Sequence, residues 1–166
     1  MKIKDINKYL PFLMLFLLSA QMNAQNIKTY DSFDSYEHLL HKENDTTYIV
    51  NFWATWCAPC VKEMPAFKKA YNEYEDKKVQ FIMTSMDFGG DVETRVKLFL
   101  DKHKIPQGMT VVILDDPDSN SWINKVNKSW SGAIPATLVY NKNDRGFYEK
   151  EFTFNELKNV IKSKIK

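Results

Sequence analysis

The 166-residue sequence contains only two cysteines and has no stretch rich in proline, glycine or serine. Two cysteines are too few for a small secreted protein that depends on several disulfides. Without a linker-like, repetitive or low-complexity segment, the chain has no evident domain boundary. These absences favour one domain, because about 140 residues are enough to bury a hydrophobic core.

An excess of charge of one sign is also lacking. The chain has 23 basic and 21 acidic residues, and removal of residues 1–24 would leave 20 of each. A neutral domain without a clustered basic face argues against nucleic-acid binding.

The amino terminus places three lysines before an apolar run over residues 10–20. This run is shorter than the roughly 20 residues that cross a bilayer, and Ala24 offers a cleavage point among small and polar residues. We therefore predict a signal peptide over residues 1–24 and a single domain over residues 25–166. The domain would be periplasmic or otherwise extracytoplasmic, and an uncleaved amino-terminal anchor is the alternative.

Hydrophobic patterns along the domain alternate between those of strands and those of helices. Residues 46–54 are dense in β-branched and aromatic side chains and predict a strand buried on both faces. The patterns then predict a helix from Cys60 to Tyr74, a strand over 79–86, a helix over 92–103, a strand over 110–114, a short helix over 119–127, strands over 136–140 and 146–152, and a helix from Phe154. The βαβαβ order of the first half implies parallel strands.

Several helix starts carry side chains suited to cap them. Asp34 and Glu37 have capping-box spacing and predict a short helix from Asp34. Asp91 is suited to cap the helix that follows it, and Thr153 with Glu156 forms a second capping box.

The two cysteines, Cys57 and Cys60, lie directly after the first strand, in the stretch NFWATWCAPC. A disulfide closing about four residues contributes roughly 2 kcal/mol through loop entropy, which makes it a weak structural bridge. A zinc site needs four ligands, and the three histidines, His38, His41 and His103, are better explained by solvated helix positions.

A reactive role for the pair follows from the position of Cys57 at the start of a helix. Free N–H groups and the helix dipole favour the thiolate there. Pro59 lacks an N–H and fixes φ, which suits the first helical turn. Two thiols at this spacing can exchange with a substrate disulfide, so that Cys57 attacks and Cys60 resolves the mixed disulfide.

The stretches VNFWATWCAPCVKEMP and GAIPATLVY resemble the thioredoxin superfamily, and more narrowly the envelope thioredoxin-like reductases of the TlpA and ResA kind. The resemblance covers nearly all of residues 25–166. It implies an α/β thioredoxin fold with a central mixed β-sheet flanked by helices and an amino-terminal extension. It also implies an inserted segment around Leu98 to Asn127, between the βαβ and ββα halves.

The resemblance further implies the residues of the site. Cys57 and Cys60 would form the redox-active disulfide, with Cys57 as the attacking thiol. Substrate would bind along an extended backbone facing the cysteines. The substrate-binding residues so implied are Trp56, Ala133, Ile134 and Pro135, the last with a cis peptide bond.

One position departs from the pattern of thioredoxin, which has a buried Asp in the strand before its cysteines. This chain has Asn51, which cannot take a proton from Cys60. Glu63 lies one turn after Cys60 and matches a glutamate that assists the thiols in the envelope reductases. A glutamate in the first helical turn can also simply complement the helix dipole, so both roles are open.

The expected function is reduction of disulfides in extracytoplasmic proteins, including those formed during cytochrome c maturation. The protein would act as a monomer without a metal or other cofactor and take its electrons from a membrane thiol transporter. The absence of a His between the cysteines favours reduction, but the potentials of such sites span about −270 to −120 mV. A disulfide oxidase or isomerase and a dithiol protein that delivers copper or haem are the alternatives. A peroxidase is disfavoured by the C-x-x-C motif at a helix start.

Overall fold

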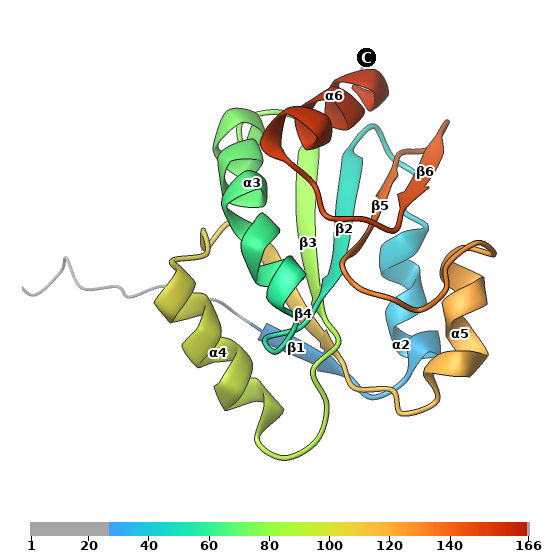
Figure 1. Cartoon of the computed structure of the whole chain (residues 1–166). Helices are drawn as coiled ribbons and strands as arrows, with labels where there is room; N and C mark the ends of the chain where they lie inside the picture. The colour runs from blue at the N-terminus through green and yellow to red at the C-terminus, as the bar shows by residue number, and fades with distance from the viewer. Residues whose placement is uncertain (1–26, 166) are drawn as a thin grey trace, which may run out of the picture.

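The computed structural model describes residues 27–165 and has a six-stranded mixed sheet at its centre, in the order β1-β4-β3-β2-β5-β6 (Figure 1). The strands are β1 (Ile27–Tyr30), β2 (Thr47–Trp53), β3 (Val79–Ser85), β4 (Thr110–Leu114), β5 (Ala136–Tyr140) and β6 (Arg145–Tyr148). The helical segments are α2 (Phe33–Tyr36), the 3-10 turn η2 (Glu37–Leu40), α3 (Ala58–Tyr74), α4 (Val92–His103), α5 (Ser119–Val126) and α6 (Phe154–Lys164). The predicted signal peptide lies outside the described residues.

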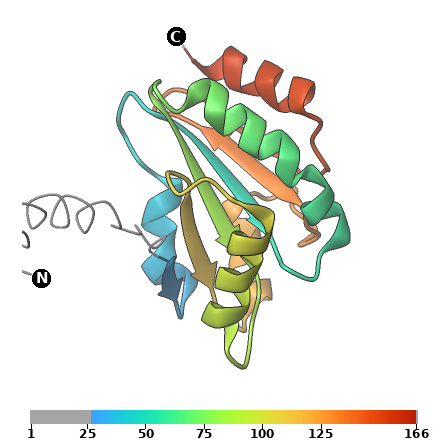
Figure 2. The ribbon, with the colours of Figure 1, turned by 90° about the vertical axis from the view of Figure 1, so that its left-hand side faces the viewer.

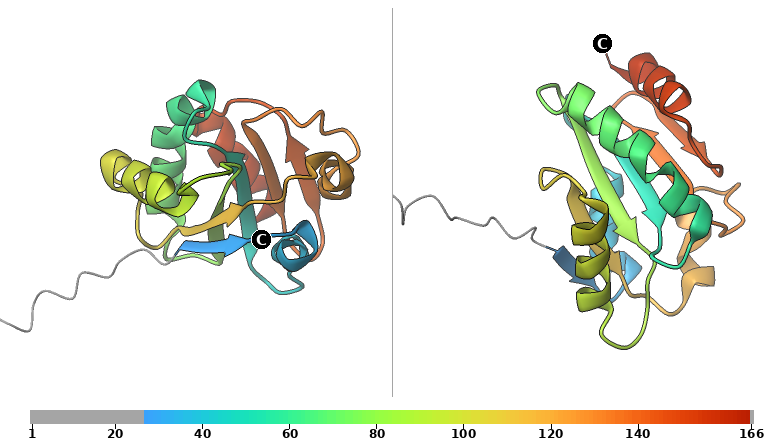
Figure 3. Two further views of the ribbon diagram at one scale, coloured as in Figure 1. Left: turned by 90° about the horizontal axis from the view of Figure 1, so that it is seen from below. Right: turned by 60° about the vertical axis from the view of Figure 1, so that its left-hand side comes forward.

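Helices cover both faces of the sheet. Helices α3, α4 and α6 lie on one face, which Figure 2 shows from the front, and α2 and α5 lie on the other (Figures 1 and 3). Each face packs its own hydrophobic cluster against these helices. This arrangement confirms the predicted α/β fold with a mixed sheet flanked by helices.

The direction of the strands brings three loops to one edge of the sheet. Strands β2, β3 and β4 are parallel neighbours, while β5 pairs with β2 in the antiparallel direction. All seven residues of β2 are buried, as its continuous apolar pattern predicts for a central strand. The segments that follow β2, β3 and β4 therefore meet at the carboxyl edge of the sheet, where open α/β sheets hold their functional sites.

The segment around Leu98 to Asn127 contributes the end of α4, strand β4 and helix α5. Strand β4 lies between β3 and β1, so this segment widens the sheet. Strand β1 pairs with β4 over four residues at the edge of the sheet and was not expected from the sequence. Its pattern IKTY is too short and too polar to stand out as a strand.

The expected capping box of Asp34 and Glu37 is wrong. Helix α2 begins at Phe33, so Asp34 lies inside its first turn, and the helix gives way to η2 at Glu37. The carboxylate of Asp116 accepts the Phe33 N–H at 2.7 Å. A side chain distant in sequence satisfies this helix start, which local spacing cannot reveal.

The strand expected over residues 146–152 is also displaced, because β6 spans Arg145–Tyr148. Beyond Tyr148 the backbone leaves the ladder, and the Phe152 N–H donates to the Glu63 carboxylate. The two other predicted caps are confirmed. Asp91 accepts the Thr94 N–H, and the Thr153 and Glu156 capping box is complete.

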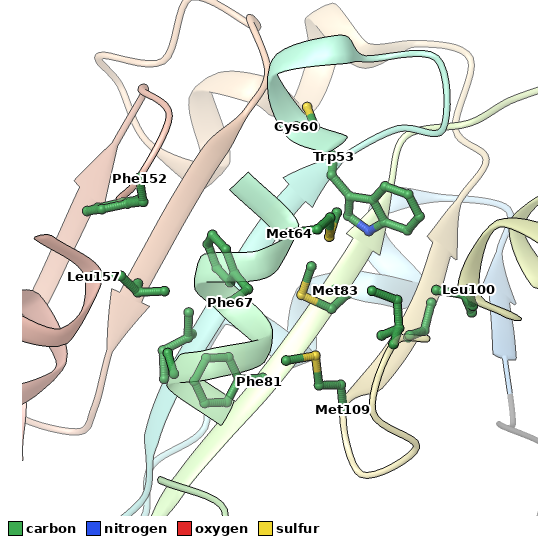
Figure 4. Close-up of a cluster of buried hydrophobic side chains, with 14 of the residues drawn as sticks. Trp53, Cys60, Met64, Phe67, Phe81, Met83, Leu100, Met109, Phe152 and Leu157 are labelled. Atoms are coloured by element: carbon green, nitrogen blue, oxygen red, sulfur yellow. The ribbon is translucent and has the colours of Figure 1, made fainter. Parts of the chain in front are cut away.

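Helix α3 turns a continuous apolar stripe toward the sheet. Cys60, Met64, Phe67 and Tyr74 are buried along it, as the alternating spacing predicts, whereas Tyr71, expected on the same stripe, is only partly buried. Figure 4 shows Cys60 at the edge of this cluster, close to Trp53 and Met64. The inner cysteine is therefore fixed by the packing of the core.

Candidate active site

The two cysteines form a disulfide at the start of α3, with an S–S distance of 2.01 Å. Cys57 is the residue before the first helical turn, and its Sγ accepts the Cys60 N–H at 3.3 Å. The exposed fraction is 5% for Cys57 and 0% for Cys60. The outer sulfur is therefore the one that a partner can reach.

The loop expected to face the cysteines does so. The Ile134–Pro135 peptide bond is cis, as the resemblance implied. The Ile134 carbonyl oxygen lies 3.7 Å from the Cys57 Sγ. The structure thus brings together Cys57 and a loop 77 residues away along the chain.

Ala133 and Ile134 differ in the backbone groups they leave available. The Ala133 carbonyl accepts the Trp130 indole N–H at 2.8 Å, and the Ala133 N–H donates to the Ser131 hydroxyl. Within residues 27–165, no partner binds the Ile134 N–H. An added strand could therefore pair with Ile134 but not with Ala133 unless these two bonds broke.

A cleft of about 580 Å³ lies beside the disulfide. Trp56, which precedes Cys57 in the chain, and Ile134, whose carbonyl faces the Cys57 sulfur, both line it, together with Phe88 and Leu114. Trp56 and Phe88 are 62% and 71% exposed, which is unusual for aromatic side chains of this size. The cleft is largely apolar, with the acidic residues Asp115 and Asp116 also in its lining. Trp56 thus lines the cleft, and its part in substrate binding stays a prediction.

Glu63 lies in a buried polar group beneath the cysteines. Its side chain is 1% exposed. One carboxylate oxygen accepts the Asn51 amide at 2.9 Å and the other accepts the Phe152 N–H at 2.8 Å. Burial raises the pKa of Glu63 from 4.5 to about 7, although both hydrogen bonds act to lower it. A carboxyl group with this pKa exchanges its proton near neutral pH.

Asn51 extends this polar group into the sheet. Its amide nitrogen also donates to the Thr137 hydroxyl at 3.1 Å. Its carbonyl oxygen Oδ1 is buried and has no partner among the described residues. The buried group therefore retains one unused acceptor next to Glu63, which is uncommon in a protein interior.

Sequence reasoning gave no individual role to Phe88 or to its neighbour Asp87. Asp87 is 0% exposed and binds the backbone directly before the cysteines. A buried Asp in a loop pattern carries no periodic signal, so only the tertiary contacts reveal it. Within residues 27–165, no three Asp, Glu, His or Cys side chains are grouped so that they could hold a metal ion.

Two relatives with a similar sequence carry the name thiol-disulfide oxidoreductase ResA. The protein of Oceanobacillus iheyensis is 40% identical over 57 residues, which cover 34% of this chain and 28% of that protein. The protein of Geobacillus thermodenitrificans is 28% identical over 129 residues, which cover 78% of this chain and 67% of that protein. The chain thus spans less than a third of the first relative and about two thirds of the second.

Solved structures show the same fold. The thioredoxin-related protein from Neisseria meningitidis serogroup B is 25% identical, with a TM-score of 0.61 over 72% of this chain and 85% of that one. StoA from Bacillus subtilis is 18% identical, with a TM-score of 0.56 over 72% of this chain and 84% of that one. The AhpC/TSA family pattern matches residues 22–145, and these residues include the cysteine loop, the cleft and the cis-proline loop. The chain therefore belongs to the AhpC/TSA family.

Proposed function

We propose that the protein is a thiol–disulfide oxidoreductase that reduces disulfides in polypeptides outside the cytoplasm. The observation that carries this proposal is the Cys57–Cys60 disulfide at the start of α3, with the Ile134 carbonyl 3.7 Å from the outer sulfur. The ResA names of the relatives support the same chemistry.

In the first step, the Cys57 thiolate of the reduced protein attacks one sulfur of a substrate disulfide. The substrate S–S bond breaks, a Cys57–substrate S–S bond forms, and the second substrate sulfur leaves as a thiolate that takes up a proton. The helix start at Cys57 favours the thiolate form through its free N–H groups and the helix dipole.

In the second step, the Cys60 sulfur attacks Cys57, closes the intramolecular disulfide and releases the remaining substrate sulfur. Cys60 must lose its proton for this attack. Glu63 is the carboxylate on the same buried face one turn along α3, and a pKa of about 7 suits it to accept that proton. The substrate gains two electrons and two protons overall, and the protein is left oxidised.

Substrate recognition is assigned to the backbone of Ile134 and to the side chains around it. An extended segment pairs with the free Ile134 N–H, as in strand addition. The cleft lined by Trp56 and Phe88 then receives apolar side chains next to the substrate cysteine. Ala133 and Pro135 shape the loop that presents Ile134.

We also propose a location and partners, which the sequence supports. The basic and apolar pattern of residues 1–24 directs the chain to the cell envelope. That compartment is oxidising, so a reductase there needs a dedicated source of electrons, which we assign to a membrane thiol transporter. Substrates include apoproteins whose haem-attachment cysteines have become oxidised.

The experiment that tests this direction of electron flow is an equilibrium titration of the Cys57/Cys60 couple against a dithiol buffer. A potential near or below about −250 mV supports a reductase, and one above about −180 mV supports an oxidase or isomerase instead. A Cys60→Ser variant should also accumulate a mixed disulfide with a protein substrate, and a Cys57→Ser variant should not. Trapping at Cys60 in the second variant would reverse the assigned roles.

A further inference from the structure

The backbone before the cysteines is held by one buried carboxylate. Asp87, in the segment after β3, accepts the Thr55 N–H at 2.8 Å and the Thr55 hydroxyl at 2.5 Å. It also accepts the Ser85 hydroxyl at 2.7 Å. Both hydrogen-bond donors of Thr55 therefore bind a single carboxylate 32 residues away in the chain.

A tight turn links Thr55 to Cys57, so the contacts of Thr55 with Asp87 also affect the position of Cys57. The Cys57 N–H donates to the Ala54 carbonyl at 3.2 Å, so Thr55 and Trp56 are the two central residues of this turn. A turn of this kind has few free dihedral angles. Movement of Thr55 therefore moves the exposed Trp56 ring and the Cys57 sulfur with it.

The same carboxylate is also connected to a second part of the cleft lining, Phe88 and Gly89. Arg95 of α4 places its Nε 3.6 Å from an Asp87 oxygen. Its Nη2 donates to the carbonyls of Phe88 and Gly89, at 3.0 and 3.1 Å. Phe88 and Gly89 line the same cleft as Trp56. Asp87 thus connects the turn of residues 54–57, called here the cysteine turn, with Phe88 and Gly89, called here the Phe88 wall.

We propose that Asp87 is a positioning residue that, with Arg95, sets the cysteine turn and the Phe88 wall of the cleft in a fixed relation. The role rests on the proposed function, since it is defined for the reaction of Cys57 with a substrate disulfide. Asp87 does not touch the reacting sulfurs and acts through Thr55. A displacement of about 1 Å at a reacting group costs up to about a hundredfold in rate.

The least disruptive test changes Thr55 and leaves the buried carboxylate in place. Thr55→Val has the shape of Thr but lacks the hydroxyl that donates to Asp87, while Thr55→Ser keeps it. The reduced variants are assayed for alkylation of Cys57 by iodoacetamide, and for reaction with 5,5′-dithiobis(2-nitrobenzoic acid) and with insulin. Thr55→Val should be about threefold slower in all three, and Thr55→Ser within about twofold of the parent.

Changes at Asp87 and Arg95 extend the test to Phe88 and Gly89 in the cleft lining. Asp87→Ala removes all the contacts and should slow the three reactions by about tenfold. Arg95→Met removes the hydrogen bonds to the Phe88 and Gly89 carbonyls. It should raise the KM for insulin by a larger factor than it lowers the rate of reaction with 5,5′-dithiobis(2-nitrobenzoic acid). Lys158→Met is the matched control, because it removes an ion pair to Glu73 of 2.7 Å that does not involve the cleft.

Unfolding temperatures of every variant separate positioning from stability. Folded Thr55→Val and Asp87→Ala variants that react at the parent's rates would overturn the proposal and leave Asp87 a purely structural group. If Asp87→Ala does not fold, the Thr55 pair decides. If the parent reacts with no disulfide, the proposed function fails. Slower alkylation of Thr55→Val would then show that Asp87 still positions the Cys57 sulfur, although not for disulfide exchange.

Discussion

Two buried carboxylates flank the cysteine loop, and their surroundings differ. Glu63 on α3 accepts two hydrogen bonds from neutral groups and has no cation partner among the described residues. Asp87 after β3 accepts three hydrogen bonds and also faces the Arg95 guanidinium. Both side chains are almost completely inaccessible to water.

The difference shows how one kind of side chain serves two purposes. Burial without a cation penalises the charged form of Glu63, so its pKa rises into the range where proton transfer is useful. The partners of Asp87 instead satisfy both of its oxygens and hold two loops together. The first carboxylate is suited to the chemistry and the second to the geometry.

The largest expected effect is on the pH dependence of the free energy of unfolding. If this effect is absent, the difference drawn between Glu63 and Asp87 is wrong. In the unfolded chain Glu63 loses its proton near 4.5, whereas in the folded protein it does so near 7. The folded state therefore binds more protons between these values, and the free energy of unfolding falls as pH rises through this window. The contribution is about 3 kcal/mol, fully lost above pH 7.

Urea unfolding of the oxidised protein at pH 5 and pH 8 measures this contribution. From pH 5 to pH 8 the parent should lose nearly this amount of unfolding free energy, and a Glu63→Gln variant should not show this loss. Glu73→Gln is the control, because the hydrogen bond with Lys158 lowers the pKa of Glu73 below 4.5. This carboxyl group therefore titrates below the pH range of the experiment, and its variant should show little change in relative stability between pH 5 and pH 8. Parallel curves for parent and Glu63→Gln would show that Glu63 titrates normally.

The next effect is on the rate of the second step. Glu63→Gln removes the proton acceptor, so closure of the Cys57–Cys60 disulfide onto a mixed disulfide should slow by about a hundredfold. The first attack by Cys57 should change much less. Rapid mixing of the reduced protein with a disulfide substrate separates the two steps. Unchanged closure would assign Glu63 to the helix dipole instead.

A smaller effect sharpens the comparison by removing one hydrogen-bond donor of Glu63. Asn51→Leu removes a donor that lowers the pKa of Glu63, so that pKa should rise above 7. The pH midpoint of the closure step should move upward by up to about one unit, or roughly 1 kcal/mol. Thr137→Val is the matched variant, because it removes the other partner of Asn51 and leaves the Glu63 donor. Equal midpoints in all three proteins would contradict the assignment.

The smallest effect compares a surface cation with Arg95. Lys62 precedes Glu63 in sequence but pairs with Glu151 at 2.8 Å, and its side chain is 74% exposed. Lys62→Ala should change the free energy of unfolding by less than about 0.5 kcal/mol, because such pairs are solvated. Arg95→Met should cost more, since it leaves the buried Asp87 without its cation. If chemical unfolding shows a larger loss of stability for Lys62→Ala than for Arg95→Met, Arg95 is not an important partner of the buried Asp87 carboxylate.

Much of the fold was predictable because it depends on local pattern. The continuous apolar run of β2 identified a central strand, and the spacing of Met64 and Phe67 identified the buried face of α3. The Thr153 cap was found for the same reason. The predictions failed where a distant group replaced a local one, as at the start of α2, where Asp116 satisfies the helix.

The same distinction between local pattern and distant contacts applies to the residues of the site. The C-x-x-C spacing after a buried strand determined by itself that two thiols lie at the start of a helix, with Cys57 outside and Cys60 inside. Only the tertiary structure decided that Asn51, Glu63 and the Phe152 backbone meet beneath them, and that Asp87 holds Thr55. Burial and hydrogen bonding between residues as far as 89 positions apart depend on strand order and not on local spacing. The sequence determined which sulfurs can react, and the fold decided what surrounds them.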